Sequence, residues 1–218
     1  GCMHACGHDG HISILLETAR IIESLKDTFK GEVILCFQPA EEIVQGAMAM
    51  INDGLFDDYK PERVIGLHIW NQLKSGFIGV NDTVVFASAD AFSLEIRGRG
   101  GHGALPHLNV DPIVAASQII TNAQTVISRE VSPQDPGVLT FGKIESGTAS
   151  NIIPDTVSIQ GTIRAYSPKV REQIFSSLKR ISSLSAEAMR TKADTEIMFG
   201  TPPVINESEV AQWVRDQS

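Results

Sequence analysis

Met3-His4-Ala5-Cys6-Gly7-His8-Asp9-Gly10-His11 opens the chain with five potential metal ligands or proton carriers, and an amphipathic segment follows it directly. One glycine separates Cys6 from His8, and it lets the backbone turn tightly enough for the thiolate and the imidazole to face one ion. Thiolate with neutral imidazole suits zinc or a related first-row divalent ion. Alone, a Cys-Gly-His sequence is more often an ordinary loop, so its meaning depends on the residues that follow.

These following residues predict an α/β unit. From about Gly10 to Asp27, apolar residues recur at helical spacing, with Asp9 as the expected N-cap. Residues 33–37 and 64–70 are continuous apolar runs, as expected of strands that are buried on both faces of a parallel sheet. Cys36 lies in the middle of the first run, which predicts a core thiol rather than a ligand.

The predicted topology brings chemistry-bearing residues to one edge of this sheet. Glu41 and Glu42 follow the first strand, and His68 lies near the end of the second. Parallel strands joined by a helical crossover have their carboxyl ends on the same edge, where α/β proteins bind ligands. The preceding helix runs antiparallel to the strand, so its N-terminus, with Cys6 and His8, points to that edge too. Five groups from three segments are therefore expected to converge.

The second half of the chain has a different pattern, which predicts an α+β sandwich. Apolar residues alternate with polar ones in the strands, and the two helices are expected to face inward at positions that include Ile113 and Leu184. The order βαββαβ is that of a ferredoxin-like domain. The expected elements, in order, are a strand at 92–96, a glycine-rich loop at 98–103, a helix capped by Asp111 with Pro112 at its first position, strands at 138–144 and 157–163, a long helix starting at Ser167-Pro168, and a strand at 195–199.

The fold class is therefore an α/β domain with a mostly parallel sheet and an inserted α+β ferredoxin-like domain. We expect residues 1–83 to be part of a metal-binding catalytic domain, which is incomplete here. Residues 84–200 form the inserted lid or dimerisation domain, and residues 201–218 begin the return to the first domain.

Composition excludes several classes of function. The net charge of −8 over 218 residues would repel a phosphate backbone, so no nucleic-acid partner is expected. Three cysteines are too few for a disulfide scaffold and are typical of a reducing, cytoplasmic protein. No apolar run is long enough to span a bilayer, and no membrane partner is expected.

The chain resembles the M20 metallopeptidase-like amidohydrolases, in the branch of hippurate hydrolases, N-acyl-amino-acid amidohydrolases and plant auxin-conjugate hydrolases. The matching motifs span nearly the whole chain in the family's order. They are Met3 to His11, Gln38-Pro39-Ala40-Glu41-Glu42, Gly66-Leu67-His68-Ile69-Trp70, Gly100-Gly101-His102-Gly103-Ala104-Leu105-Pro106-His107, Asn151-Ile152-Ile153-Pro154-Asp155 and Gly161-Thr162-Ile163-Arg164.

Two family features are not found in this sequence: an upstream segment with an Asp-Ala-Leu-Pro motif, and a downstream segment that carries a final histidine ligand. A dense motif at a chain terminus is also unusual, since termini fray. We therefore expect this chain to be a fragment that lacks about half of the usual subunit.

The resemblance implies that Cys6, His8, Glu42 and His68 are ligands of one or two divalent ions, which would be Zn, Mn, Co or Ni. Glu41 is implied to be the general base that takes a proton from metal-activated water and hands it to the leaving nitrogen. The ordinary alternatives are a buried apolar thiol for Cys6, a core histidine for His68 and a solvated acidic pair for the two glutamates.

Three residues of the second half complete the implied site. His102 would reach the site of a neighbouring subunit and stabilise the developing oxyanion. Asn151 and Arg164 would bind substrate, with the arginine holding a carboxylate in bidentate fashion. A flexible loop histidine and an ordinary surface arginine are the alternatives. These roles imply a homodimer that forms through the inserted domain.

The expected function is metal-dependent hydrolysis of the amide bond in a small-molecule N-acyl amino acid. Two alternatives remain open at this point. The first alternative is a truncated, catalytically inactive remnant that keeps a dimerisation domain. The second is a dipeptidase or aminopeptidase of the M20 type. The sequence does not distinguish the acyl group, the amino acid or the metal.

Overall fold

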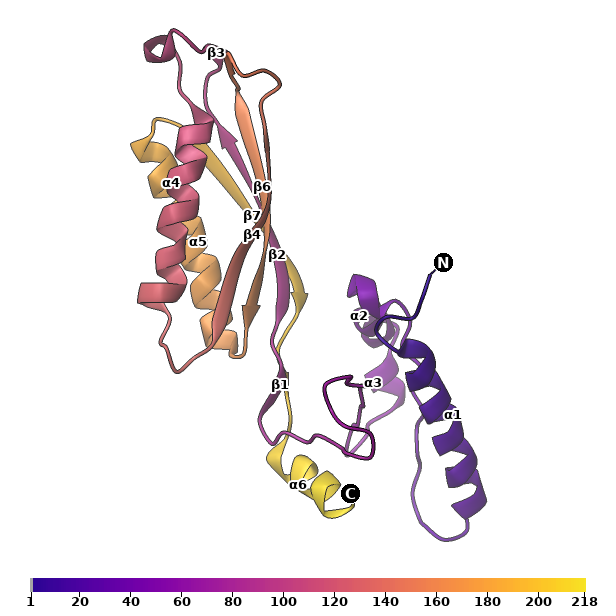
Figure 1. Ribbon diagram of the computed structural model, residues 1–218. Coiled ribbons are helices and arrows are strands. Elements are labelled where there is room, and N and C mark those ends of the chain that lie inside the picture. The colour runs from indigo at the N-terminus through magenta and orange to yellow at the C-terminus, as the bar shows by residue number, and fades with distance from the viewer. Residues whose placement is uncertain (1) are drawn as a thin grey trace. The chain divides into compact units, whose positions relative to one another are not determined.

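The computed structural model describes residues 2–218, which separate into two compact units (Figure 1). Of the described residues, 2–80 and 214–218 form the first unit, and 81–213 form the second. Within residues 2–218, no helix combines the length and the apolar content that crossing a membrane requires.

The second unit is built on a four-stranded antiparallel sheet. β2 and β6 pair without a break from Asp90 opposite Ile163 to Arg97 opposite Thr156. Along the chain, the strands alternate with two helices in the order β2-α4-β4-β6-α5-β7, which is the βαββαβ order that the sequence predicted. Side by side, the strands are β4 (Gly137–Ser146), β6 (Thr156–Ala165), β2 (Ala89–Arg97) and β7 (Lys192–Thr201).

Two helices lie against one face of this sheet (Figure 1). α4 spans Pro112–Thr125 and continues into the short π-helical segment η3, Val126–Glu130. α5 spans Pro168–Ala188 and packs against α4 and β7. Both helices are present where the apolar periodicity predicted them.

Each helix begins at a side-chain cap. The Asp111 carboxylate accepts a hydrogen bond from the backbone N–H of Ile113 at 2.8 Å, and the Ser167 hydroxyl accepts one from Val170 at 3.5 Å. Each cap satisfies a backbone donor that has no partner within the helix, and a proline follows where no such donor is needed. The predicted starts of both helices are therefore confirmed.

The core lies between the sheet and the helices. Our predictions that Ile113 and Leu184 face inward are wrong: Ile113 is 46% exposed and Leu184 is 57% exposed. α4 is apolar on more than one side, so the sequence pattern does not decide which side packs, and the buried stripe is displaced by one residue to include Ala115 and Ile119. Residues that are fully buried in this core include Phe92, Ile96, Val157, Ile159, Ile163, Ile174 and Leu178.

An ion pair anchors β2 to α5 and β7. The side chain of Asp90 is fully buried, and Arg171 Nε donates a hydrogen bond to its Oδ2 atom at 2.8 Å. The backbone N–H of Gly200 donates to Oδ1 at 3.0 Å. Burial alone would raise the pKa of Asp90, but the hydrogen bonds from Arg171 and Gly200 outweigh burial and lower the pKa below its ordinary value.

Short elements complete the second unit and lead out of it. Two-residue strands β3 (Gly101–His102) and β5 (Ile152–Ile153) pair with each other, with His102 opposite Ile152. The others are β1 (Val84–Phe86), which pairs with β8 (Val204–Ile205), the 3-10 turn η2 (Pro106–Leu108), and the final helix α6 (Ser208–Asp216).

The first unit has helices as its regular elements within residues 2–80. α1 does not start after Asp9 as expected: it begins at His8, and Gly7 is its N-cap with a left-handed φ of 75°. Glycine reaches this conformation without steric cost, so the turn falls two residues earlier and Asp9 lies in the first helical turn. The elements are α1 (His8–Leu25), the 3-10 turn η1 (Glu41–Ile43), α2 (Gly46–Asn52) and α3 (Leu55–Asp58).

The expected parallel strands at 33–37 and 64–70 are not formed, which corrects the predicted sheet of the first unit. Both runs are irregular, and Val33 and Val64 are 49% and 71% exposed. A doubly buried strand needs a paired neighbour and a layer on each face, and neither run has a strand partner within residues 2–218. Cys36 is accordingly exposed rather than in a core. For the same reason α1 has no buried residue.

Candidate metal centre

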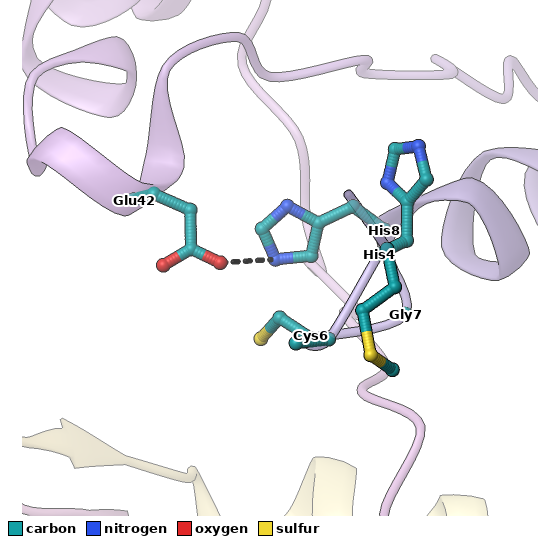
Figure 2. A pocket seen from close by; sticks show the side chains of 7 residues that line it. His4, Cys6, Gly7, His8 and Glu42 are labelled. Atoms are coloured by element: carbon teal, nitrogen blue, oxygen red, sulfur yellow. Dashed lines mark ion pairs between the residues drawn. The ribbon is translucent and has the colours of Figure 1, made fainter. Parts of the chain in front are cut away.

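Cys6 and His8 are placed by the left-handed turn that starts α1. Cys6 precedes the turn, and His8 is the first helical residue. With Gly7 between them, their donor atoms lie within 4.8 Å of each other. Figure 2 shows Cys6, His8 and Glu42 lining one pocket, together with His4. The loop and the helix start therefore form one wall, and η1 contributes the opposite acidic wall.

His68 joins this group from a segment that lies 62 positions after Cys6 along the chain. Its Nε2 atom is 3.4 Å from Cys6 Sγ. Its other nitrogen, Nδ1, donates a hydrogen bond to the carbonyl oxygen of Ile69 at 2.6 Å. With the proton on Nδ1, the lone pair of Nε2 is directed at the thiol, which is the arrangement of a metal-ligating histidine.

The acidic side of the site is the turn η1. His8 Nε2 is 3.3 Å from Glu41 Oε2 and 3.7 Å from Glu42 Oε1. Ala40 and Val44, on either side of the turn, both have left-handed backbones, with φ of 52° and 59°. Residues with a Cβ rarely adopt this conformation, and such strain is typical of segments that hold functional groups.

The ligand atoms form two overlapping groups. The donor atoms of Cys6, His8 and His68 lie within 4.8 Å of one another, and so do those of His8, Glu41 and Glu42. His8 belongs to both groups. The set combines one soft sulfur, two imidazoles and two carboxylates, which suits zinc and neighbouring first-row divalent ions and offers room for one ion or two. The predicted convergence of five groups from three segments is found.

Loss of hydration, together with local charges, shifts two pKa values in the site. Loss of hydration and the nearby Glu42 and Glu41 carboxylates raise the pKa of the Cys6 thiol. Loss of hydration and the imidazoles of His68 and His8 lower the pKa of His11. A bound divalent cation acts on a thiol in the opposite sense, since a coordinating thiol loses its proton.

Sequence reasoning assigned no role to His11, nor to His4, which lines the same pocket. The Nε2 atom of His11 accepts a hydrogen bond from the backbone N–H of Ile69 at 2.9 Å, and its ring centroid is 4.6 Å from that of His68. The available signal was its spacing: His11 follows His8 by three residues on a helix, so the two share a face.

The three other predicted residues belong to the second unit. His102 and Asn151 are close to each other, because Gly103 N donates to the Asn151 carbonyl oxygen at 2.8 Å beside the β3–β5 pair. Arg164 is exposed near the far end of β6. Arg164 lies eight positions after the first residue of that strand, Thr156, which is about 26 Å at roughly 3.3 Å per residue. Within one chain, Arg164 is therefore remote from the other two.

Comparison with protein families and curated proteins gives one consistent result. The model of peptidase family M20/M25/M40 matches residues 1–218. The chain is 41% identical to an N-acetyl-L-cysteine deacetylase of Bacillus subtilis (strain 168), over 99% of this chain and 51% of that protein. It is 40% identical to an N-acyl-L-amino acid amidohydrolase of Geobacillus stearothermophilus, over 96% of this chain and 56% of that protein. The chain thus spans about half the length of these relatives.

Solved structures agree with the sequence relatives. A proposed aminohydrolase of methicillin-resistant Staphylococcus aureus superposes with a TM-score of 0.93 at 34% identity, over 98% of this chain and 57% of that one. The YXEP protein of Bacillus subtilis, described as a dinuclear metal-binding peptidase, superposes with a TM-score of 0.75 at 29% identity, over 98% of this chain and 55% of that one. The similarity extends over both units of the chain.

Proposed function

The chain belongs to peptidase family M20/M25/M40, and from this membership and the geometry of the first unit we propose that it carries the metal centre of an amidohydrolase that acts on N-acyl amino acids. The observation that carries the proposal is the convergence of Cys6, His8 and His68 with two glutamates. The amide-cleaving relatives named above support the reaction class.

Cys6, His8, His68 and Glu42 would hold one or two divalent ions. The donor set suits Zn, Co, Ni or Mn, and the dinuclear site described for the Bacillus subtilis peptidase supports two. When bound, such an ion supplies a Lewis acid that polarises the amide carbonyl and makes water more acidic. Glu42 is the better ligand of the two glutamates because it lines the same pocket as Cys6 and His8 (Figure 2).

Glu41 is then left to move protons. Its side chain is 60% exposed, so it can reach water and substrate, and its Oε2 atom lies 3.3 Å from His8 Nε2. As a general base it would take a proton from the attacking water and return it to the amide nitrogen as the C–N bond breaks. Both steps need a carboxylate that is near the metal ligands without being one.

His102, Asn151 and Arg164 would act on the substrate. We assign His102 to oxyanion stabilisation, and Asn151 and Arg164 to substrate binding. The separation of about 26 Å along β6 is greater than the length of an N-acyl amino acid, so one substrate cannot touch both ends of the strand in one chain. This separation supports a homodimer in which the two copies contribute different residues to each site.

The second unit would be a ferredoxin-like domain inserted into the catalytic domain, over about residues 84–200, with residues 201–218 returning to it. Its sheet order β4-β6-β2-β7 and its two helices on one face support this assignment. β4 and β7 are its edge strands, and an exposed edge can pair with a second copy. The free thiols at Cys2, Cys6 and Cys36 support a reducing, cytoplasmic location.

The test is hydrolysis of N-acetyl and N-benzoyl amino acids, hippurate included, by the purified chain loaded with Zn²⁺, Mn²⁺, Co²⁺ or Ni²⁺. Dipeptides serve as the comparison. Release of free amino acid from the N-acyl substrates is expected. Preference for dipeptides would indicate a peptidase of the same family. Metal binding without any turnover would indicate a remnant, which the exposure of Val33, Val64 and Ile65 would then explain.

A further inference from the structure

The contacts of the Ile69 peptide suggest a role for His11 that is separate from metal ligation. We propose that His11 is a positioning residue: it fixes the backbone of Ile69 and so holds the adjacent His68 beside Cys6. This inference rests on the proposed metal centre and deepens it, because it says what keeps a ligand from the 64–70 segment in place.

Imidazoles hold both the backbone N–H and the carbonyl oxygen of Ile69. The N–H of Ile69 donates to His11 Nε2 at 2.9 Å, and its carbonyl oxygen accepts from His68 Nδ1 at 2.6 Å. The first bond locates the backbone relative to α1. The second orients the ring of His68, so that Nε2 faces Cys6 Sγ at 3.4 Å. Outer contacts of this kind fix the tautomer and the orientation of metal-ligating histidines.

The Ile69 side chain packs against the first turn of α1. A Cβ atom added to Gly10 would lie 2.5 Å from Ile69 Cδ1, and one added to Gly7 would lie 3.6 Å from the same side chain. Gly10 therefore leaves the space that Ile69 occupies. Two consecutive residues of α1 therefore contact Ile69. Gly10 faces its side chain, and His11 accepts the hydrogen bond from its backbone N–H.

Side-chain and backbone contacts, rather than strand pairing, hold the 64–70 segment within residues 2–218, and those of Ile69 are among them. This segment is not part of a sheet within residues 2–218, so hydrogen bonds between strands do not fix the position of His68. His11 is not among the grouped ligands, and its Nε2 lone pair already accepts the Ile69 N–H. The geometry therefore makes His11 a support for a ligand and not a ligand itself.

The test is Co²⁺ titration of the full chain, followed by the visible d–d bands and the near-ultraviolet thiolate-to-cobalt band. His11→Leu removes the acceptor, whereas His11→Gln keeps one. His107→Leu, in the second unit, is the matched control. We expect His11→Leu to weaken Co²⁺ binding by about 10- to 100-fold, as loss of an outer contact typically does. His11→Gln should recover most of the affinity with an unchanged spectrum, and His107→Leu should bind as the unaltered chain does.

A second variant separates positioning from folding. Gly10→Ala keeps every imidazole and favours the helix, because alanine is a better helix former than glycine. The added methyl group meets only Cδ1, the flexible end of the Ile69 side chain, so we expect Co²⁺ binding to weaken by less than in His11→Leu, with an unchanged or larger helical signal in far-ultraviolet circular dichroism. Normal Co²⁺ binding by His11→Leu, or weaker binding by Gly10→Ala than by His11→Leu, would overturn the role of His11 and leave the metal centre itself standing. If His11→Leu and His11→Gln lose Co²⁺ affinity equally and change the spectrum equally, His11 is itself a metal ligand, and the positioning role is wrong. Absence of Co²⁺ binding by the unaltered chain would instead overturn the metal centre itself.

Discussion

Gly46 packs against the carbonyl oxygen of Pro39 so closely that a Cβ atom at residue 46 would lie 1.6 Å from that oxygen. The contact closes the loop that contains the turn η1, and thereby brings Glu41 and Glu42 to His8. The left-handed backbones at Ala40 and Val44 store strain in the same loop, of roughly 1–3 kcal/mol each. The contact between Pro39 and Gly46, at the two ends of the loop, holds this strained turn in place.

Gly46→Ala is therefore expected to displace both glutamates from the site. The loop must open to admit the methyl group, and overpacking of this kind costs about 1–3 kcal/mol. If the whole cost falls on the metal-binding state, metal affinity decreases by about 5- to 150-fold. The measurement is the number of metal ions per chain after equilibrium dialysis. Gly66→Ala is the control, since a Cβ there meets nothing within 4 Å. Equal metal content in both variants would show that the Gly46 contact does not position the turn.

The two glutamates should separate by their effects on metal and on turnover. Glu41→Gln is expected to keep the metal content while turnover of an N-acetyl amino acid falls by about 10²–10⁴-fold, as loss of a general base does. Glu42→Gln is expected to lose metal first, because amides are weaker ligands than carboxylates. Loss of metal in the Glu41 variant, with normal turnover per bound ion, would exchange the two assignments.

The Asp90–Arg171 pair should contribute much of the stability of the second unit. Arg171→Leu leaves a fully buried carboxylate without its cation, and removal of one partner of a buried pair typically costs about 3–5 kcal/mol. Arg97→Leu is the control, because its contacts with Glu95 and Asp194 are on the surface, where a pair contributes about 0–1 kcal/mol. Urea unfolding followed by circular dichroism measures both. Similar losses in the two variants would contradict the structure.

The same pair predicts a dependence of stability on acid. The pKa of Asp90 is lower in the folded protein than its ordinary value of 3.8, so the folded state binds this proton less readily than the unfolded state. The stabilisation is fully present above about pH 4 and is lost as the pH falls through the folded-state pKa. The free energy of unfolding should decrease over this range. Asp90→Asn should lack this part of the slope, and an identical slope would argue against the assignment.

Helix caps give a smaller and independent test. Asp111→Ala removes the acceptor for the N–H groups of Ile113 and Val114 and should destabilise the second unit by about 1 kcal/mol, within a typical range of about 0.5–2. Asp111→Asn retains a capping oxygen and should be nearly neutral. Urea midpoints compare the two directly, and a large loss in the asparagine variant would mean that charge, and not capping, is what matters there.

Local signals in the sequence were sufficient for the second unit. The alternation of apolar and polar residues predicted β2 and β6, and Asp111 and Ser167 predicted the starts of α4 and α5. These features could be predicted because the elements that they pack against or pair with are part of this chain. The errors at Ile113 and Leu184 are errors of helix rotation. Periodicity cannot decide rotation when apolar residues occur on more than one side of a helix.

The first unit shows what such signals cannot supply. Residues 33–37 and 64–70 have the composition of buried strands, but strand formation needs hydrogen-bonded neighbours, and these runs find none within residues 2–218. The site residues still meet, because Gly7, Ile69 and His11 connect their segments directly. The spacing of His11 from His8 placed both on one helix face, but the role of His11 was missed because the backbone N–H that it contacts lies 58 positions away along the chain.

The most direct test of the metal centre is a crystal of this chain soaked in Co²⁺ or Zn²⁺ and measured at the absorption edge of the metal. We predict an anomalous peak about 2.3 Å from Cys6 Sγ and about 2.0–2.1 Å from nitrogen atoms of His8 and His68, with a glutamate oxygen of η1 also bonded. The contradictory result would be crystals in which the ion binds elsewhere or not at all, while Cys6 and His68 remain hydrogen-bonded to each other.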